Sequence, residues 1–243
     1  MRAMPNPIGK LRAVKKKVFF RYLEATDQLS PLCHADDIEG IDAELSEAMT
    51  SHADRENVST EIPKHGRGSE YQRTRLTQVA GRSAQLYDGS FLEIGAFLGH
   101  TTVWLAEKAR EHNRKVIVVD PWQPGTQNCD GDEYQRFLEN TYHQRDVIDV
   151  HRSSSLAPDI QRVLGDQKFA FAFVDGLHTY RACLSDIFTI AHAPIIAVDD
   201  IRWKPELMLA FRQAAKSMKK LAYHHSSCRE GYLVDSRLLD KQE

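Results

Sequence analysis

The chain has 243 residues, which gives room for one or two domains. Its 32 lysines and arginines nearly balance 34 aspartates and glutamates, so the net charge is −2. Such a balance disfavours sequence-independent nucleic-acid binding, which needs an excess of cations to displace phosphate counterions. Hydrophobic residues make up 42% and charged residues 27%, which is typical of a globular domain and excludes wholesale disorder.

The longest apolar runs are Phe169–Val174 and Ala193–Val198, with six residues each. A membrane-spanning helix needs about 20, and no apolar stretch of signal-peptide length follows the N-terminal cations. None of the four cysteines forms a CxxC pair, which excludes a zinc knuckle or a thioredoxin-type site. We therefore expect a cytoplasmic protein that contacts neither membrane nor nucleic acid.

Residues 1–60 lack strand-like runs. Apolar residues at three- and four-residue spacing predict a basic amphipathic helix at Lys10–Arg21 and an acidic one at Asp36–Glu56. Pro63, Gly66 and Gly68 make Ser59–Ser69 a linker. We expect residues 1–69 to form a helical cap or lid with its linker, and a possible contact between copies of the chain in a homo-oligomer.

From residue 70 onward, helical stretches alternate with short apolar strands. The pattern predicts helices at 70–85, 101–111, 132–144, 158–164, 180–191 and 205–217. It predicts strands at 91–94, 116–119, 147–150, 169–174, 195–198, 221–225 and 232–234, the last two as an antiparallel pair. This alternation predicts an α/β fold, a doubly wound, mostly parallel sheet of seven strands in a domain spanning 70–243. Ligands of such sheets bind beyond the carboxyl ends of the strands.

The first predicted strand ends in a glycine-containing turn, Glu93-Ile94-Gly95-Ala96-Phe97-Leu98-Gly99. Glycines there allow a tight turn and close approach of a ligand to the following helix. Phe97 stands where the dinucleotide fingerprint GxGxxG has its central glycine, and the Walker A lysine is missing. The carboxylate of Glu93, two residues before Gly95, suits a cationic ligand better than a pyrophosphate.

The second predicted strand ends at Asp120. An acid at this place is positioned to accept hydrogen bonds from both ribose hydroxyls of a nucleoside ligand. A helix cap or an ordinary surface carboxylate is the alternative interpretation. Trp122, close behind Asp120, could border the same ligand.

Three carboxylates follow two strands that we expect to be neighbours: Asp175 after one, and Asp199 with Asp200 after the other. Clustered carboxylates repel one another unless a cation or a proton neutralises them, and Mg²⁺ prefers such hard oxygen ligands. His178, three residues after Asp175, could take a proton from a substrate hydroxyl; a purely structural hydrogen-bonding role is the alternative.

The motifs Glu93-Ile94-Gly95-x-x-x-Gly99, Asp120 and Phe173-Val174-Asp175-Gly176-Leu177-His178-Thr179-Tyr180 resemble those of class I S-adenosylmethionine-dependent methyltransferases. The likeness is greatest to the bacterial macrocin- and mycinamicin-type sugar O-methyltransferases, which are metal-dependent, and covers about residues 70–235. The resemblance implies a Rossmann-like fold, S-adenosylmethionine as cofactor and a requirement for Mg²⁺. It implies a cofactor site made by Glu93, Gly95, Gly99, Thr101, Asp120, Trp122, Ser154 and Asp175. It further implies metal ligands Asp175, Asp199 and Asp200, and His178 with Asp175 as catalytic residues.

The resemblance thus predicts methyl transfer to a hydroxyl of a small molecule, such as a sugar or a natural-product intermediate. Two departures stand out: His192-Ala193-Pro194 replaces the usual glycine-containing turn, and the fifth strand ends in Asp199-Asp200 instead of His-Asp or Asp-Asn. A metal-independent N-methyltransferase acting on an amine is the nearest alternative. An NAD-dependent oxidoreductase and a non-catalytic module that keeps the nucleotide-binding fold are alternatives of other classes.

Overall fold

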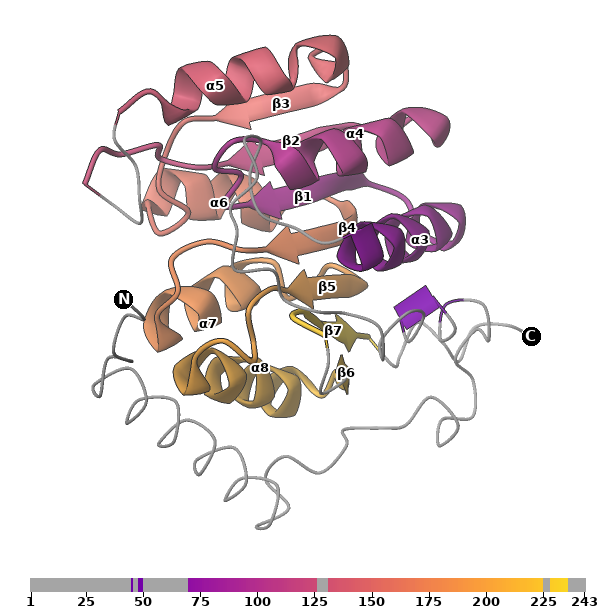
Figure 1. The fold of residues 1–243 in the computed structure, drawn as a ribbon. Helices are drawn as coiled ribbons and strands as arrows, with labels where there is room; N and C mark the ends of the chain where they lie inside the picture. The colour runs from indigo at the N-terminus through magenta and orange to yellow at the C-terminus, as the bar shows by residue number, and fades with distance from the viewer. Residues whose placement is uncertain (1–44, 46–47, 50–69, 126–130, 225–227, 236–243) are drawn as a thin grey trace, which may run out of the picture.

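The computed structural model describes residues 45, 48–49, 70–125, 131–224 and 228–235. They form a seven-stranded sheet with helices on both faces (Figure 1). The strands are β1 (Ser90–Ile94), β2 (Val116–Val119), β3 (Ile148–His151), β4 (Phe169–Val174), β5 (Ile195–Val198), β6 (Leu221–His224) and β7 (Gly231–Val234). The helices are α3 (Glu70–Leu86), α4 (His100–Glu111), α5 (Glu133–Asn140), the 3₁₀ turn η3 (Tyr142–Gln144), α6 (Pro158–Asp166), α7 (Tyr180–Thr189) and α8 (Pro205–Met218).

The strand order is β3-β2-β1-β4-β5-β7-β6. β1 pairs in parallel with β2 and with β4, while β7 lies antiparallel between β5 and β6. This confirms the predicted α/β, doubly wound and mostly parallel sheet. The chain order reverses between β1 and β4, and the carboxyl ends of strands at such a switch point are where ligands bind.

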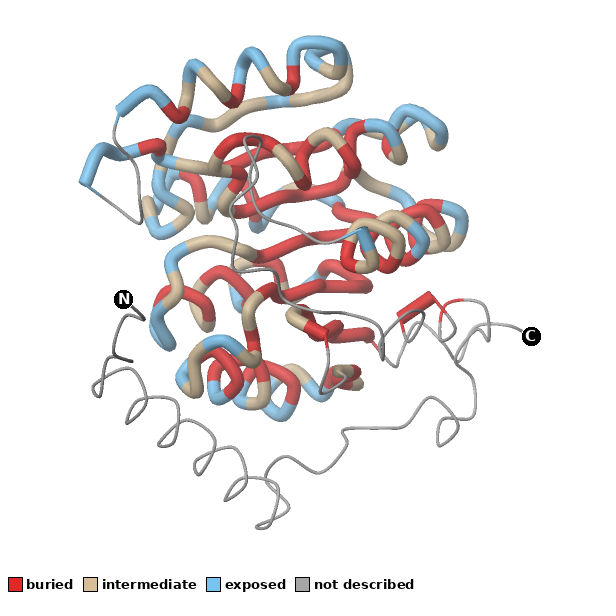
Figure 2. Tube along the Cα trace, in the orientation of Figure 1, coloured by how far each residue is buried: buried red, intermediate tan, exposed pale blue. Residues whose placement is uncertain are grey.

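Two hydrophobic cores fill the space between the sheet and its helices. Alternate residues of each strand face opposite sides, so Phe91 of β1 belongs to the core that includes residues of α3, α4 and α5, whereas Leu92 belongs to the core that includes residues of α6, α7 and α8. β4 is buried along its whole length, because helices cover both of its faces (Figure 2).

The observed boundaries differ from the predicted ones in two informative places. The helix expected at 132–144 ends at Asn140, because the backbone of Thr141 leaves the helical conformation, and a 3₁₀ turn follows. β3 begins and ends one residue later than expected. It is an edge strand whose residues are partly exposed, so it lacks the strong apolar pattern of the inner strands.

Most of the predicted cap lies outside the described residues, including the basic helix at 10–21 and the linker at 59–69. Of the acidic segment, the side chains of Leu45, Ala48 and Met49 are buried in the core of α3 and α4. This agrees with the apolar stripe expected there. The division into 1–69 and 70–243, and the role of the first part in oligomer formation, stay predictions. Among the described helices, none combines the length and apolar character that crossing a membrane requires.

Candidate functional site

The turn between β1 and α4 has two positions, Gly95 and Gly99, whose backbone conformation and close neighbours favour glycine. Gly95 has φ +90°, and a Cβ there would lie 2.1 Å from the backbone oxygen of Asp175. Gly99 has φ +82°, and its Cβ would press on the side chains of Thr141 and Phe137. Gly95 therefore lets the ends of β1 and β4 approach closely, and Gly99 lets α4 begin against α5.

Glu93, near the end of β1, is a buried carboxyl group at the base of this turn, 1% exposed. Thr102 of α4 donates a hydrogen bond from its hydroxyl to the Glu93 carboxylate. Burial raises the pKa of Glu93 to about 8, and the neighbouring carboxylates of Asp175 and Asp120 add to the rise. Thr102 was not predicted from the sequence; the adjacent Thr101, which was, lines the cavity described below.

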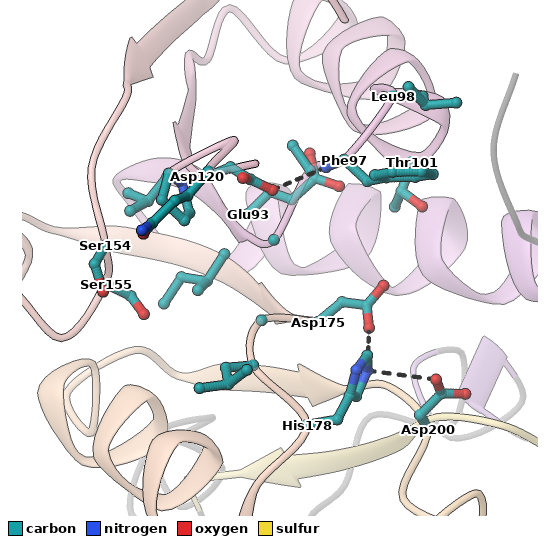
Figure 3. Close-up of a pocket in the computed structure, with 18 of the residues that line it drawn as sticks. Glu93, Phe97, Leu98, Thr101, Asp120, Ser154, Ser155, Asp175, His178 and Asp200 are labelled. Carbon is teal, nitrogen blue, oxygen red and sulfur yellow. Dashed lines mark hydrogen bonds and ion pairs between the residues drawn. The ribbon is translucent and has the colours of Figure 1, made fainter. Parts of the chain in front are cut away.

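Asp120 lies just beyond β2 and links the loop that contains Phe97 to the loop that contains Trp122. Its carboxylate accepts hydrogen bonds from the backbone N–H of Phe97 at 2.9 Å and of Trp122 at 2.7 Å. Burial raises the pKa of Asp120, while these backbone hydrogen bonds oppose the rise. Asp120 is thus held in place with its carboxylate at the cavity wall (Figure 3).

Trp122 lies behind the loops instead of bordering the ligand space. Its side chain is 2% exposed and packs against the rings of Tyr134 and Phe137. The indole N–H donates to the backbone oxygen of Phe97 at 2.6 Å. Phe97, not Trp122, lines the cavity, so the structure gives Trp122 the task of supporting the loop.

A cavity of about 470 Å³ opens at the carboxyl ends of the strands, within the range usual for small-molecule sites. The predicted site residues that line it are Glu93, Gly95, Thr101, Asp120, Ser154, Asp175, His178 and Asp200. Gly99, Trp122 and Asp199 do not line it. Residues that line it without having been predicted include Phe97, Leu177, Trp203, Lys204 and Arg229.

His178 lies between two carboxylates at one end of this cavity (Figure 3). Its Nε2 is 3.0 Å from Oδ1 of Asp175 and 3.4 Å from Oδ2 of Asp200. The three side chains bring one ligand atom each within 4.8 Å of one another. Burial raises the pKa of Asp175, and its hydrogen bond with His178 opposes the rise. Both carboxylates therefore lie close to the same imidazole nitrogen.

Asp199 is not part of this group. Its carboxylate accepts a hydrogen bond from Nε2 of Gln72 at 2.9 Å and lies 3.3 Å from Nη2 of Arg229. The same Nη2 lies 2.8 Å from Oδ1 of Asp200. Asp200, the residue of this pair that lies beside His178, has φ +54°, in the left-handed region. The expected set of Asp175, Asp199 and Asp200 is therefore brought together as Asp175, His178 and Asp200.

A second buried ion pair anchors the segment that carries Arg229. Arg75 of α3 and Glu230 are both fully buried, with Nε and Oε1 2.6 Å apart and Nη2 and Oε2 3.1 Å apart. The hydroxyl of Tyr232 donates to Glu230 at 3.0 Å. Because Glu230 follows Arg229 directly, this pair anchors the backbone from which Arg229 reaches Asp199 and Asp200.

Residues 92–200 match the family described as a methyltransferase domain. Over this segment the chain is similar to the methyltransferase domain that the family represents. The match runs from β1 to the turn after β5, and so includes the glycine turn, Asp120 and the carboxylates beside His178. The resemblance drawn from the motifs is confirmed. No curated protein sequence matches the chain significantly.

Several solved structures have folds similar to that of this chain. Cofactor-bound Rv0187 from MTB is 19% identical, with a TM-score of 0.54 over 82% of this chain and 92% of that one. CalS11, a TDP-rhamnose 3'-O-methyltransferase of calicheamicin biosynthesis, is 16% identical, with a TM-score of 0.52 over 80% and 94%. The O-methyltransferase TomG from Streptomyces achromogenes, solved with S-adenosylmethionine, is 16% identical, with a TM-score of 0.50 over 83% and 94%. At these identities the likeness shows the fold.

Proposed function

We propose that the protein transfers the methyl group of S-adenosylmethionine to a hydroxyl group of a small molecule, and that His178 accepts the hydroxyl proton. The observation that carries this proposal is the position of His178. It lies 3.0 Å from Asp175 and 3.4 Å from Asp200, in the same cavity as the glycine turn and Asp120. The names of CalS11 and TomG, both O-methyltransferases, support oxygen as the acceptor.

The residues of the cofactor half of the cavity suit S-adenosylmethionine. The backbone at Gly95 leaves no space for a side chain, and the buried carboxyl of Glu93 gains an opposite charge from a bound ammonium group. The Asp120 carboxylate is fixed where a ribose could donate to it. Ser154 and Ser155, after β3, line another part of the wall, and we assign the adenine of the cofactor to this part.

The bound cofactor supplies an electrophilic methyl group, so the protein must chiefly align an oxygen behind that methyl and remove its proton. His178 takes the proton of the hydroxyl as the oxygen–carbon bond forms and the sulfur–carbon bond breaks. S-adenosylhomocysteine leaves and the proton remains on the imidazole. The carboxylates of Asp175 and Asp200 stabilise this imidazolium in a part-buried site, as an acid does for the histidine of a catalytic triad.

The expected Mg²⁺ also fits this end of the cavity by charge. Asp175, Asp199 and Asp200 bring three carboxylates, against which Arg229, paired with Asp199 and Asp200, sets one permanent positive charge. The remaining excess suits a divalent cation with hard oxygen ligands. We propose that Asp175 and Asp200 would hold it, where it would lower the pKa of the acceptor hydroxyl. Asp199, whose carboxylate contacts Gln72 and Arg229, would not bind the ion itself but would add negative charge near it.

The buried free thiol of Cys183 agrees with a reducing, cytoplasmic location.

The test is turnover of radiolabelled S-adenosylmethionine with a panel of hydroxylated small molecules and their amine counterparts. We expect His178→Asn to lower kcat by about 10²-fold or more, while calorimetry shows unchanged affinity for S-adenosylhomocysteine. His143→Asn, at an exposed histidine on η3, is the matched control and keeps full activity. Methylation of the amines alone would replace this proposal with N-methyl transfer. Activity that persists in EDTA would refute the proposed role of Mg²⁺.

A further inference from the structure

The wall of the cavity beyond His178 contains an exposed tryptophan. Trp203, in the turn between β5 and α8, is 48% exposed, whereas Trp104 and Trp122 are 6% and 2% exposed. Leu177, next to His178 in sequence, is also 48% exposed. Both side chains line the cavity. An indole left open in a cavity offers a flat apolar surface on which a ring can stack.

Trp203 and Lys204 form one corner with His178. The rings of His178 and Trp203 meet edge to face, with centroids 5.1 Å apart and planes at 86°. Nζ of Lys204 lies 4.5 Å from the centroid of the Trp203 ring and donates to the backbone oxygen of His178 at 3.2 Å. These contacts hold the indole and the ammonium beside the imidazole that takes the proton.

The two cations of this end of the cavity differ in their partners. Arg229 is paired with both Asp199 and Asp200. Lys204 pairs with no carboxylate among the described parts of the chain; its contacts there are a backbone oxygen and the Trp203 ring. An ammonium group has three donors, so Lys204 keeps donors for a ligand. An anion that enters the cavity can therefore bind the ammonium group of Lys204 without displacing a carboxylate, as it would have to at Arg229.

We propose that this corner binds the methyl acceptor, and that the acceptor is a hydroxylated ring that carries an anionic group, a phosphate or a carboxylate. The ring stacks on Trp203, the anion binds Lys204, and the hydroxyl reaches His178. This inference rests on the proposed O-methyl transfer and names the substrate class for it.

The experiment measures binding of matched probe pairs to the full chain saturated with S-adenosylhomocysteine. One pair is 3,4-dihydroxybenzoate with neutral catechol, and the other is a hexose phosphate with the neutral methyl hexoside. The two pairs distinguish an aromatic ring from a sugar ring. We expect the anionic member of at least one pair to bind about 10-fold or more tightly than its neutral partner.

Lys204→Met keeps the aliphatic stem and removes the charge, so it should abolish that preference and leave the neutral member within about twofold. Trp203→Leu should weaken both members of the pair, because both lose the stacking surface. Lys216→Met is the control, since Lys216 is exposed in the last turn of the same helix, α8, and the net charge changes equally.

The acceptor class is overturned if no anion in the panel binds more tightly than its neutral partner, or if Lys204→Met and Lys216→Met have the same effect. Methyl transfer is scored separately. A wild-type enzyme that methylates neutral hydroxyl compounds but shows no preference for anions refutes the acceptor class alone. Anion binding at Lys204 together with methylation only of amines refutes the proposed reaction and keeps the binding site.

Discussion

Binding of the cofactor should release a proton from Glu93. In the free protein this carboxyl is 1% exposed and burial raises its pKa to about 8, so at pH 7 about 0.9 of the molecules hold it protonated. The ammonium group of a bound S-adenosylhomocysteine would be an opposite charge close to it. Such a charge lowers a carboxyl pKa by about 1–3 units.

A fall of about 2 units would leave the Glu93 pKa near 6, so about 0.1 of the molecules would stay protonated at pH 7 and about 0.8 proton would be released per ligand. Glu93→Gln cannot ionise and should release none. Its affinity for S-adenosylhomocysteine should fall as well, because the amide gives the ammonium a neutral partner in place of a charged one.

Calorimetric titrations at pH 7 in two buffers of different ionisation enthalpy measure the released proton directly. Glu107→Gln, at an exposed glutamate of α4, is the matched control and should release as much as the wild type. A wild-type binding heat that is the same in both buffers would refute the reasoning. So would equal proton release by Glu93→Gln, since the proton would then come from another group.

The same pKa makes a second measurement possible on the free protein. Because the folded state raises the pKa of Glu93 from 4.5 to about 8, it binds the proton more tightly than the unfolded chain does. The stabilisation is complete below pH 4.5 and is lost as the pH rises through about 8. Relative to Glu93→Gln, the wild type should therefore lose on the order of 5 kcal/mol of unfolding free energy between these limits, as urea titrations across this pH range will show.

Two further variants test the loops and the second ion pair. In Gly95→Ala the new Cβ would lie 2.1 Å from the backbone oxygen of Asp175, so we expect calorimetry to show at least about 100-fold weaker binding of S-adenosylhomocysteine; Gly165→Ala, where the space is open, should bind normally. Arg75→Met should lose about 3–5 kcal/mol in urea unfolding, because it leaves the carboxylate of Glu230 buried without a cation. Arg75→Met combined with Glu230→Gln should recover part of that loss, and a single variant within 1 kcal/mol of the wild type would contradict the ion pair's role.

The parallel sheet could be predicted because each of its inner strands is a short run of apolar residues that can be recognised in the sequence alone. All six residues of β4 are buried, and a short apolar run between turn residues is what such burial requires of a sequence. Asp175 at the end of that strand could then be placed at the ligand edge of the sheet without knowledge of any contact. The edge strand β3, half exposed, carried the weakest pattern and was placed one residue early.

The partners of the acids could not be predicted, because no local pattern links them. Gln72 reaches Asp199 across 127 positions of the chain, and Arg229 reaches it across 30. The two adjacent aspartates were indistinguishable in the sequence. In the structure they differ in their partners, since Gln72 contacts Asp199 and His178 contacts Asp200. Asp200 also has a left-handed backbone, φ +54°, a conformation uncommon for non-glycine residues.

The residues of the site come from two parts of the chain, the segment that matches the methyltransferase family and the segments on either side of it. The segment that matches the methyltransferase family, 92–200, supplies the glycine turn, Asp120 and the carboxylates. The groups that balance or orient those carboxylates, Gln72 and Arg229, come from outside it. So do Trp203 and Lys204, which we assign to the acceptor.

A near-neutral protein can thus hold a strongly charged site, since the net charge of −2 is the sum over separate regions. Within the cavity, acids on the matched segment attract cations, while Lys204 from the flanking segment is open to an anion. Changes in the flanking segments can therefore alter the acceptor without disturbing the cofactor turn. For this reason we expect exchanges at Trp203 and Lys204 to change which acceptors bind, while the affinity for S-adenosylhomocysteine stays within about twofold.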